Sequence, residues 1–410
     1  MFIGEGTEHI EDAHLQYAKA KSASEDVHRL PSNSATWLSK QHLPLMWLWS
    51  AEGRLDSSAI SEPVEPEWKQ DMFKHGTVLR RKKDWCDSGE ENDRNVHVCQ
   101  HFQHNVKYLK ITCDQSLKAN RKNFARILHN LSETATNLLG LSMVCTGQNP
   151  YFYSGQDLLQ SVNNLFKANS YLHLRHIDFR KMPFTLDDGT IQLVSSRSPC
   201  LESLFINNKT FVCKVTSETL KEALRHCPNL SALGLFYTSL TEAVLAELLN
   251  AKRLPLKLLQ LHCERMDQFN PTISEEMWKT LAKRHQTLSV DIELDHTVPA
   301  KKIPQILQPA IPVASIELNT FTFMVEQVSF ISRNYHSTLK RAVLQTTSSD
   351  KLNQALLQLA SCCLSLEEIH CYCVVSVAVV QAFLLHCPRL CKYTLKTSKE
   401  PHPWLPEILQ

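Results

Sequence analysis

Cysteine and histidine residues gather near the C-terminal end of the chain, and thiolate and imidazole are ligands that zinc prefers in proteins. The residues concerned are His370, Cys371, Cys373, His386, Cys387 and Cys391. Their Cys-x-Cys spacing differs from the Cys-x-x-Cys pair of most structural zinc sites, and Cys371 falls at an inward-facing position of an expected strand. We therefore interpret the group as packing residues, keep a zinc site as a minor alternative, and expect no metal ion and no cofactor.

No other arrangement of residues points to catalysis. The sequence contains no G-x-G-x-x-G, G-x-x-x-x-G-K-[ST], H-E-x-x-H or G-x-S-x-G, which are the motifs that prepare phosphate, zinc or serine chemistry. The 19 His residues stand mostly singly in expected loops and helix ends, and only 10 residues are Gly. The chain is therefore expected to be a non-catalytic protein.

The charge and the apolar content of the chain narrow the choice of partner. Lys and Arg number 44 against 42 Asp and Glu, a formal charge of +2, whereas binders of nucleic acid or of membrane surfaces usually carry a strongly basic face. No run of 18 apolar residues occurs, so no transmembrane helix is expected. We therefore expect protein partners, with no nucleic acid and no membrane.

The cellular compartment follows from the N-terminus and the cysteines. Met1–Ile3 is followed by polar and acidic residues instead of the apolar core of a secretion signal. The 14 cysteines are therefore interpreted as free thiols of a reducing compartment. We expect a cytoplasmic protein, and the basic run at 80–83 makes a nuclear location an alternative.

From about residue 100 the chain repeats an apolar-x-x-apolar-x-apolar motif. Ten copies keep this spacing: Val106/Leu109/Ile111, Leu138/Leu141/Met143, Leu174/Ile177/Phe179, Leu201/Leu204/Ile206, Leu230/Leu233/Leu235, Leu256/Leu259/Leu261, Val313/Ile316/Leu318, Leu339/Ala342/Leu344, Leu366/Ile369/Cys371 and Leu390/Tyr393/Leu395. A weaker copy at 288–294 alternates Val290, Ile292 and Leu294. Successive copies begin 24 to 36 residues apart, and this motif at this spacing is typical of leucine-rich repeats.

Amphipathic helical stretches lie between the copies of the motif. One such stretch carries apolar residues at i, i+3, i+4, i+7 and i+8, namely Leu352, Ala355, Leu356, Leu359 and Ala360. One strand and one helix cannot bury their apolar faces alone, so the units must stack. The sequence predicts an α/β fold, a leucine-rich-repeat horseshoe solenoid with parallel strands on the concave side and helices on the convex side.

Cys-Pro pairs recur just before expected strands. Cys227-Pro228 and Cys387-Pro388 take matching positions in their repeats, and Ser198-Pro199 is a variant of the same corner. Proline stops the helix, and the small, weakly polar Cys packs at the corner that follows. We interpret these cysteines as structural.

The concave face is the expected binding surface, because residues that alternate with the apolar ones point away from the helices. Phe205, Phe236 and Tyr372 are expected to be exposed there, and aromatic and arginine residues are typical of interface hot spots. Trp404 would be a further contact or a cap on the last repeat. The candidate partner-binding residues are His176, Asp178, Arg180, Phe205, Asn207, Phe236, His262, Glu317, Arg341, Tyr372 and Trp404.

The N-terminal quarter of the chain lacks this regularity. Residues 1–95 hold 12 Lys and Arg against 17 Asp and Glu, a net charge of −5, and show no sustained period of 2 or 3.6. We expect an irregular, largely disordered segment at 1–95 and a leucine-rich-repeat array of about eleven repeats at 96–410.

Five stretches of the repeats are individual rather than general repeat pattern. They are Leu174–Lys181 (LRHIDFRK), Phe184–Asp188 (FTLDD), Ile306–Val313 (ILQPAIPV), His370–Ser376 (HCYCVVS) and Glu400–Trp404 (EPHPW). Through these stretches, residues from about 97 to 410 resemble the F-box/leucine-rich-repeat family. The resemblance implies a substrate receptor of an SCF ubiquitin ligase. In such a receptor the F-box docks on the Skp adaptor of the cullin scaffold, and the repeats hold the client protein to be ubiquitinated.

The F-box that the resemblance implies is not recognisable. The family pattern begins with Leu-Pro-x-Glu and ends with Val-Cys-x-x-Trp, whereas His42–Met46 lacks the acidic residue and no Val-Cys-x-x-Trp follows. Pro63 and Pro66 interrupt what should be further helices. The F-box is therefore expected to be either absent or degenerate.

Two functions from different classes follow. The preferred one is a non-catalytic substrate-recognition subunit of an SCF-type ubiquitin ligase, which binds client proteins on the face of the repeats. The alternative is a free-standing repeat scaffold or decoy that binds a partner without assembling a ligase, because its F-box is missing.

Overall fold

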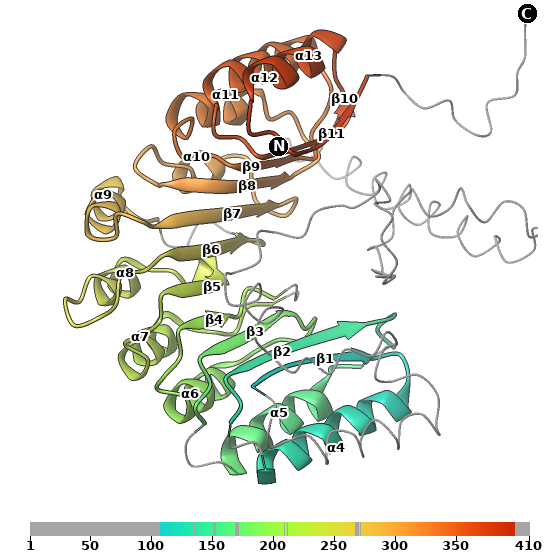
Figure 1. Cartoon of the computed structure of the whole chain (residues 1–410), viewed down its shortest axis with the longest axis vertical. Helices are drawn as coiled ribbons and strands as arrows, with labels where there is room; N and C mark the ends of the chain where they lie inside the picture. The colour runs from blue at the N-terminus through green and yellow to red at the C-terminus, as the bar shows by residue number, and fades with distance from the viewer. Residues whose placement is uncertain are drawn as a thin grey trace, which may run out of the picture. The chain divides into compact units, whose positions relative to one another are not determined.

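A computed structural model describes residues 107–397, apart from 135–136, 151–152, 169–171, 209, 211, 267–269 and 271. Along this part of the chain strands alternate with helices, and the strands form one eleven-stranded sheet in sequence order (Figure 1). Every pair of neighbouring strands is parallel. The predicted leucine-rich-repeat solenoid is confirmed.

The strands are short and regularly spaced along the chain. They are β1 (Tyr108–Asp114), β2 (Gly140–Thr146), β3 (His176–Lys181), β4 (Ser203–Phe205), β5 (Ala232–Phe236), β6 (Leu258–Cys263), β7 (Ser289–Asp295), β8 (Val313–Asn319), β9 (Arg341–Leu344), β10 (Glu368–Val374) and β11 (Lys392–Lys396).

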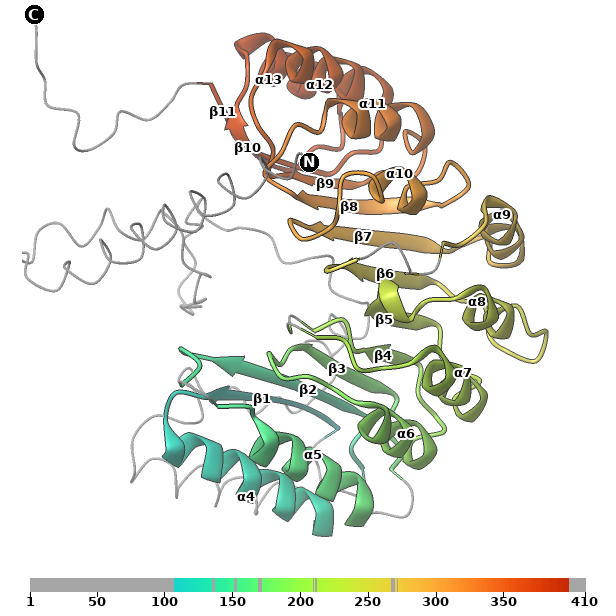
Figure 2. The ribbon, with the colours of Figure 1, turned by 180° about the vertical axis from the view of Figure 1, so that it is seen from behind.

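The helices follow the strands in turn and line the convex side of the sheet, as the view from behind also shows (Figure 2). They are α4 (Lys118–Thr134), α5 (Gln156–Ala168), α6 (Asp188–Arg197), α7 (Ser217–His226), α8 (Glu242–Leu248), α9 (Glu275–Arg284), α10 (Ile303–Ile306), α11 (Val325–Asn334), α12 (Asp350–Cys362) and α13 (Val377–His386), with a 3₁₀ turn, η4 (Tyr237–Ser239), after β5. None of the helices in the described ranges is long and apolar enough to cross a membrane.

The core lies between the sheet and the helices, and the repeat motif supplies it. The middle motif position stacks from strand to strand, because Leu204 pairs with Leu233 and Leu233 with Leu259. All three side chains are fully or almost fully buried. Burial of one leucine contributes about 2 kcal/mol, so the repetition of this position holds the array together.

Hydroxyl and carboxylate side chains set where most helices begin. Each of these side chains accepts a hydrogen bond from the backbone N–H three residues later and so satisfies a donor that has no partner within the helix. The residues are Asp187, Thr216, Thr241, Ser274, Ser349 and Ser376. The predicted apolar stripe at 352–360 is buried on α12, as expected.

The Cys-Pro corners have the structural role that the sequence predicts. Cys227 ends α7, and its buried thiol donates to the carbonyls of Ser195 and Ser198 at 3.5 and 3.4 Å. Burial raises the pKa of Cys227 to about 12, which keeps the thiol protonated and unreactive. Cys387 repeats this arrangement at the end of α13 with the carbonyls of Ala360 and Cys363.

The predicted division at residue 95 lies outside the described residues, and so do the expected F-box region and the basic run at 80–83. The first described strand, β1, begins at Tyr108, within the first motif copy. The boundary between the two segments stays a prediction.

Candidate functional site

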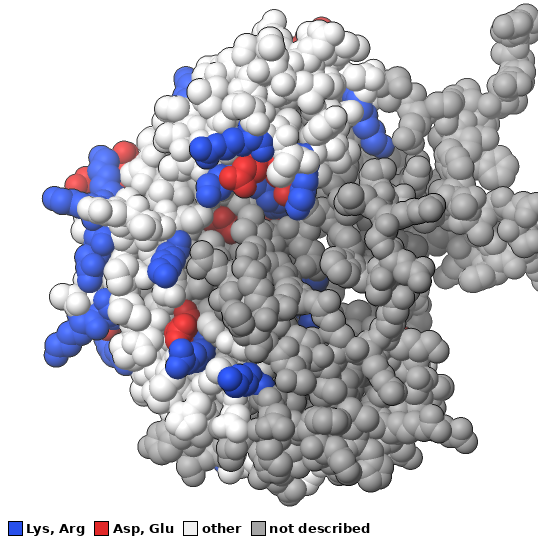
Figure 3. All heavy atoms as spheres, in the orientation of Figure 1, with Lys and Arg blue, Asp and Glu red and all other residues white. Residues whose placement is uncertain are grey.

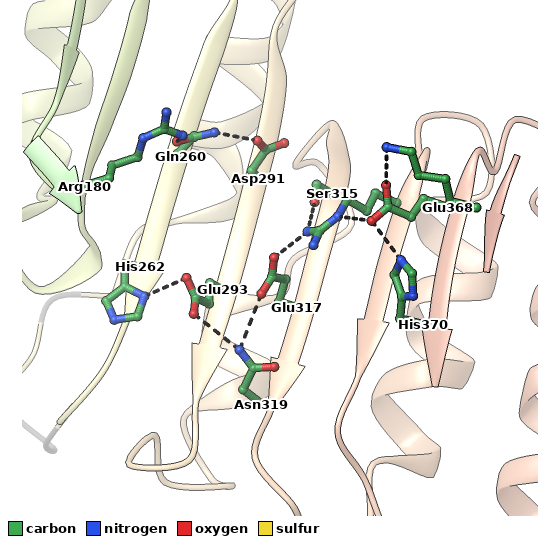
Figure 4. A network of polar contacts seen from close by, with 12 residues as sticks. Arg180, Gln260, His262, Asp291, Glu293, Ser315, Glu317, Asn319, Glu368 and His370 are labelled. Carbon is green, nitrogen blue, oxygen red and sulfur yellow. Dashed lines mark hydrogen bonds and ion pairs between the residues drawn. The ribbon is translucent and has the colours of Figure 1, made fainter. Parts of the chain in front are cut away.

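The concave face of the sheet carries a network of polar side chains that reaches from β3 to β11 (Figure 4). Its members stand at strand positions that alternate with the core leucines and therefore point away from the helices. Residues far apart in the sequence are brought together there because the parallel register aligns equivalent positions of successive repeats.

Arg180 organises the first part of this network. Its guanidinium contacts both carboxylate oxygens of Asp178, at 3.0 and 2.9 Å, and donates to Oε1 of Gln260 at 3.2 Å. The same group lies 4.5 Å above the ring of Phe205, a cation–π contact. Arg180 on β3 therefore reaches across two strands to β6.

Glycine at position 234 makes this long reach feasible. Asp178, Phe205, Gly234 and Gln260 form one row across β3 to β6, each paired with the next. A Cβ atom on Gly234 would lie 2.2 Å from Oδ1 of Asn207 and 2.7 Å from a ring carbon of Phe205. The missing side chain thus leaves room for its neighbours to fold over β5.

Arg341 is the centre of the second part of the network. Its guanidinium donates to Oε1 of Glu368 at 2.8 Å, to Oγ of Ser315 at 3.3 Å, and to the carboxylate of Glu317. The side chain is 7% exposed. Burial disfavours the charged form, but Glu317 and Glu368 outweigh burial and raise the pKa of Arg341 above its usual range.

Histidine and carboxylate groups continue the network on either side of Arg341. His370 bridges Glu368 at 3.0 Å and the hydroxyl of Thr394 at 2.8 Å. On β7, Asp291 accepts a hydrogen bond from Nε2 of Gln260 at 3.0 Å, and burial raises the pKa of Asp291 to about 6. The two arginine-centred parts are thus neighbours across β7 and β8.

His262 lies between two carboxylates near the ends of β6 and β7. Its ring nitrogens are 3.2 Å from Oε2 of Glu264 and 3.2 Å from Oε2 of Glu293. Burial opposes protonation of the imidazole, but the two carboxylates prevail and raise the pKa of His262 to about 9. The imidazole is therefore charged at neutral pH.

A pocket of about 410 Å³ opens where these strands end. Phe321 stands at this pocket with 65% of its surface exposed and a left-handed backbone, φ 56°. Its N–H donates to the carbonyl of Gln345 at 2.8 Å, which holds the turn in place. The lining residues are Thr210, His262, Glu264, Glu293, Asp295, His296, Asn319, Phe321 and Gln345.

Most of the residues proposed from the sequence fall on this face, but their exposure differs from expectation. Phe205 and Phe236 were expected to be exposed and are buried, because Arg180 covers the first ring and His262 packs edge-on against the second at 5.6 Å. Tyr372 is 36% exposed, as expected.

The remaining candidates from the sequence lie either within the polar network or beside it on the concave face, apart from Trp404. His176 is buried and bonds Oγ of Ser203 at 3.0 Å, and Asn207 folds over Gly234. Glu317 pairs with Arg341. Trp404 lies outside the described residues. The partner-binding role of all these residues stays a prediction.

The candidates from the sequence omit Asp291 and Glu293, the acidic members of the network that stand on β7. The motif copy of β7 is shifted, so its outward positions were not assigned. The alternation of Val290, Ile292 and Leu294 was the available signal, because the residues between buried positions of a strand must point to the other face.

The C-terminal cysteines and histidines do not converge on one point. Cys371 is buried in the core, with its sulfur 3.5 Å from that of Cys373, while His370 faces the concave side and Cys391 is exposed. Within the described ranges, no group of three or more His, Cys, Asp or Glu is arranged to hold a metal ion.

Replacing Arg341 tests whether the buried network stabilises the fold. Arg341→Met leaves Glu317 and Glu368 without their shared cation, so we expect the free energy of unfolding to fall by about 3–5 kcal/mol. The matched control is Arg175→Met, because Arg175 pairs at 3.1 Å with Glu202 while the two side chains are 54% and 39% exposed. That change should cost less than about 1 kcal/mol in urea unfolding. Equal costs would contradict a structural role for the network.

The raised pKa of His262 predicts a pH dependence of stability. Because the folded-state pKa of about 9 exceeds the ordinary histidine pKa of about 6.5, the contribution of His262 is present in full below pH 6.5 and is lost as pH rises through 9. We expect the unfolding free-energy difference between the parent protein and His262→Gln to shrink by up to about 3 kcal/mol over this range. A difference that stays constant from pH 6 to 10 would contradict the assignment.

No family model matches the chain. Two known proteins, however, are similar to most of its length. The F-box/LRR-repeat protein 8 of Homo sapiens is 39% identical over 315 residues, 77% of this chain and 83% of that protein. The protein of the same name in Mus musculus is 37% identical over 337 residues, 82% of this chain and 89% of that protein.

Among solved structures, the crystal structure of the Rad7 and Elc1 complex in yeast contains a chain with 15% sequence identity and a TM-score of 0.43. The alignment covers 75% of this chain and 74% of that chain, and it supports no inference about function. The sequence identity to the human and mouse proteins is decisive: the chain belongs to the F-box/LRR-repeat protein family.

Proposed function

We propose that the protein is a non-catalytic substrate-recognition subunit of an SCF-type ubiquitin ligase and binds its client on the concave face. Membership of the F-box/LRR-repeat family supports this role. The contribution of such a subunit is positional, because holding a client near the ubiquitin-charged enzyme raises the effective concentration of the reacting groups.

The observation that carries the proposal is the organisation of the concave face. Its charged side chains are held by one another across the strands, as Arg341 is held by Glu317 and Glu368. A surface that is already ordered loses little side-chain entropy when a partner binds. Tyr372 and Phe321, which remain accessible, supply aromatic groups of the kind found at interface hot spots.

The charge at the strand ends favours a basic segment of the client. Glu264, Glu293 and Asp295 line the pocket and outnumber its one charged imidazole, that of His262, and none of the nine lining residues is Lys or Arg. Phe321 beside these carboxylates offers a ring face to a cationic side chain. In Figure 3, the described part of the visible face shows Lys and Arg interspersed with Asp and Glu rather than one continuous basic stripe, which fits protein better than nucleic acid.

A second candidate function is a free-standing scaffold or decoy that binds the same client without a ligase. The observation in its favour is the sequence of residues 1–95, in which the F-box pattern is not recognisable. That segment lies outside the described residues. Both candidates use the concave face, so they differ only in assembly with the Skp adaptor.

Co-expression of the full chain with the Skp adaptor separates the two functions. The substrate-receptor proposal predicts a complex that elutes at 1:1 in size-exclusion chromatography, and a chain that begins at residue 96 should elute without the adaptor. A soluble full chain that elutes alone would contradict ligase assembly and would favour the scaffold.

A further inference from the structure

Two cysteine thiols that take no part in the Cys-Pro corners or in the polar network meet on strand β10. The sulfur atoms of Cys371 and Cys373 lie 3.5 Å apart, within hydrogen-bond distance of each other. Other buried thiols, such as those of Cys227 and Cys387, donate instead to backbone carbonyls. A disulfide needs its sulfur atoms at about 2 Å, so a short movement brings this pair to the bonded distance.

An irregularity at the end of β10 brings the two cysteines together. In the pairing of β10 with β11, at the red end of Figure 1, Cys371 stands opposite Leu395 and Val374 opposite Lys396. β10 therefore advances by three residues where β11 advances by one, and such a bulge bends the strand. Residues i and i+2 of a regular strand lie about 6.6 Å apart, near the upper limit for a disulfide, and bending shortens this separation.

The two thiols have different surroundings. Cys371 is fully buried, whereas Cys373 is partly exposed. The hydrogen bond from Cys371 lowers the pKa of Cys373 to about 7, so that much of this thiol is ionised at neutral pH. The same hydrogen bond and burial raise the pKa of Cys371. The pair thus combines a reactive, accessible thiolate with a protected thiol beside it.

We propose that Cys371 and Cys373 form a site of reversible oxidation by hydrogen peroxide. The thiolate of Cys373 attacks the peroxide, so that an S–O bond forms, the O–O bond breaks and hydroxide leaves with the proton that Cys373 had released, as water. The thiol of Cys371 then attacks the resulting sulfenic acid, so that the S–S bond forms, the S–O bond breaks and a second water leaves. Two thiols are oxidised to one disulfide, and one peroxide is reduced to two water molecules.

The residue between the two cysteines, Tyr372, faces the opposite side of the sheet. Its ring stacks on His370 with the ring centroids 6.3 Å apart, and 36% of its surface is exposed. A bond between the flanking cysteines therefore constrains the backbone that holds an accessible ring of the concave face. Disulfides of reducing compartments are usually transient and redox-sensing, which suits a pair that reacts reversibly. This inference is independent of the proposed function.

Mass spectrometry of the full chain tests the site. The reduced protein is treated with hydrogen peroxide, the remaining thiols are alkylated, and the peptide that carries the pair is analysed without reduction. We expect Cys371 and Cys373 to lose their free thiols about tenfold or more faster than the exposed Cys391, and dithiothreitol to restore both. A pair that stays fully alkylated, or a Cys373 oxidised to sulfinic acid beside a free Cys371, would overturn the proposal.

Serine variants assign the linkage. Cys373→Ser removes the partly exposed thiol, so Cys371 should stay reduced under the same treatment. Cys391→Ser is the matched control at an exposed cysteine outside the pair and should form the disulfide at the rate of the parent chain. Oxidation of Cys371 at the parent rate in Cys373→Ser would contradict the assigned partner.

Phenylarsine oxide tests the pair in the parent chain, without a substitution or an oxidant. Trivalent arsenic bridges two thiols whose sulfur atoms lie close together, so one adduct should protect both Cys371 and Cys373 from alkylation and block the disulfide. Dimercaptopropanol, a competing dithiol, should remove the adduct. Alkylation of both cysteines at the unprotected rate would show that the two sulfur atoms do not meet and would overturn the proposal.

Discussion

The parallel register of successive strands is the constraint on which the rest of the structure depends. It places each motif position beside its equivalent in the next repeat, so that Leu204, Leu233 and Leu259 form one continuous row of the core. The same register aligns Asp178, Phe205, Gly234 and Gln260 on the opposite face. Core and concave surface are therefore two sides of one arrangement, and a change of register would disrupt both.

The concave network separates residues that shape the surface from residues that are accessible on it. Arg341 and Glu368 are buried and paired, and a charge removed from water must be compensated by its neighbours. Such pairs fix the form of the face and offer few free groups. The groups that remain accessible lie around these pairs. They are the carboxylates that line the pocket and the rings of Phe321 and Tyr372. In the proposed function, the client contacts these accessible groups on a surface that the buried pairs hold in shape.

Sequence periodicity was sufficient to predict the repeats, the inward positions of β2 to β10 and the Cys-Pro corners, because local spacing determines which side chains face the core. It did not predict that the last motif residue, Tyr393 on β11, is 51% exposed. It could not predict the contact between Arg180 and Gln260, which lie 80 residues apart and meet because Gly234 leaves room. It also misjudged Phe205, whose exposure depends on the guanidinium above it rather than on its strand position. The pocket escaped prediction because the left-handed turn at Phe321 has no repeat signature.

Quantitative capture of client proteins tests the binding face most directly. The double variant Glu264→Gln, Asp295→Asn removes two pocket charges, and Glu218→Gln, Glu276→Gln removes two exposed charges from the convex helices, where these side chains are 75% and 82% exposed. If the concave pocket holds the client, proteins retained by the parent chain fall about tenfold or more with the first variant and remain with the second. Equal retention by both variants would contradict the concave face as the binding surface.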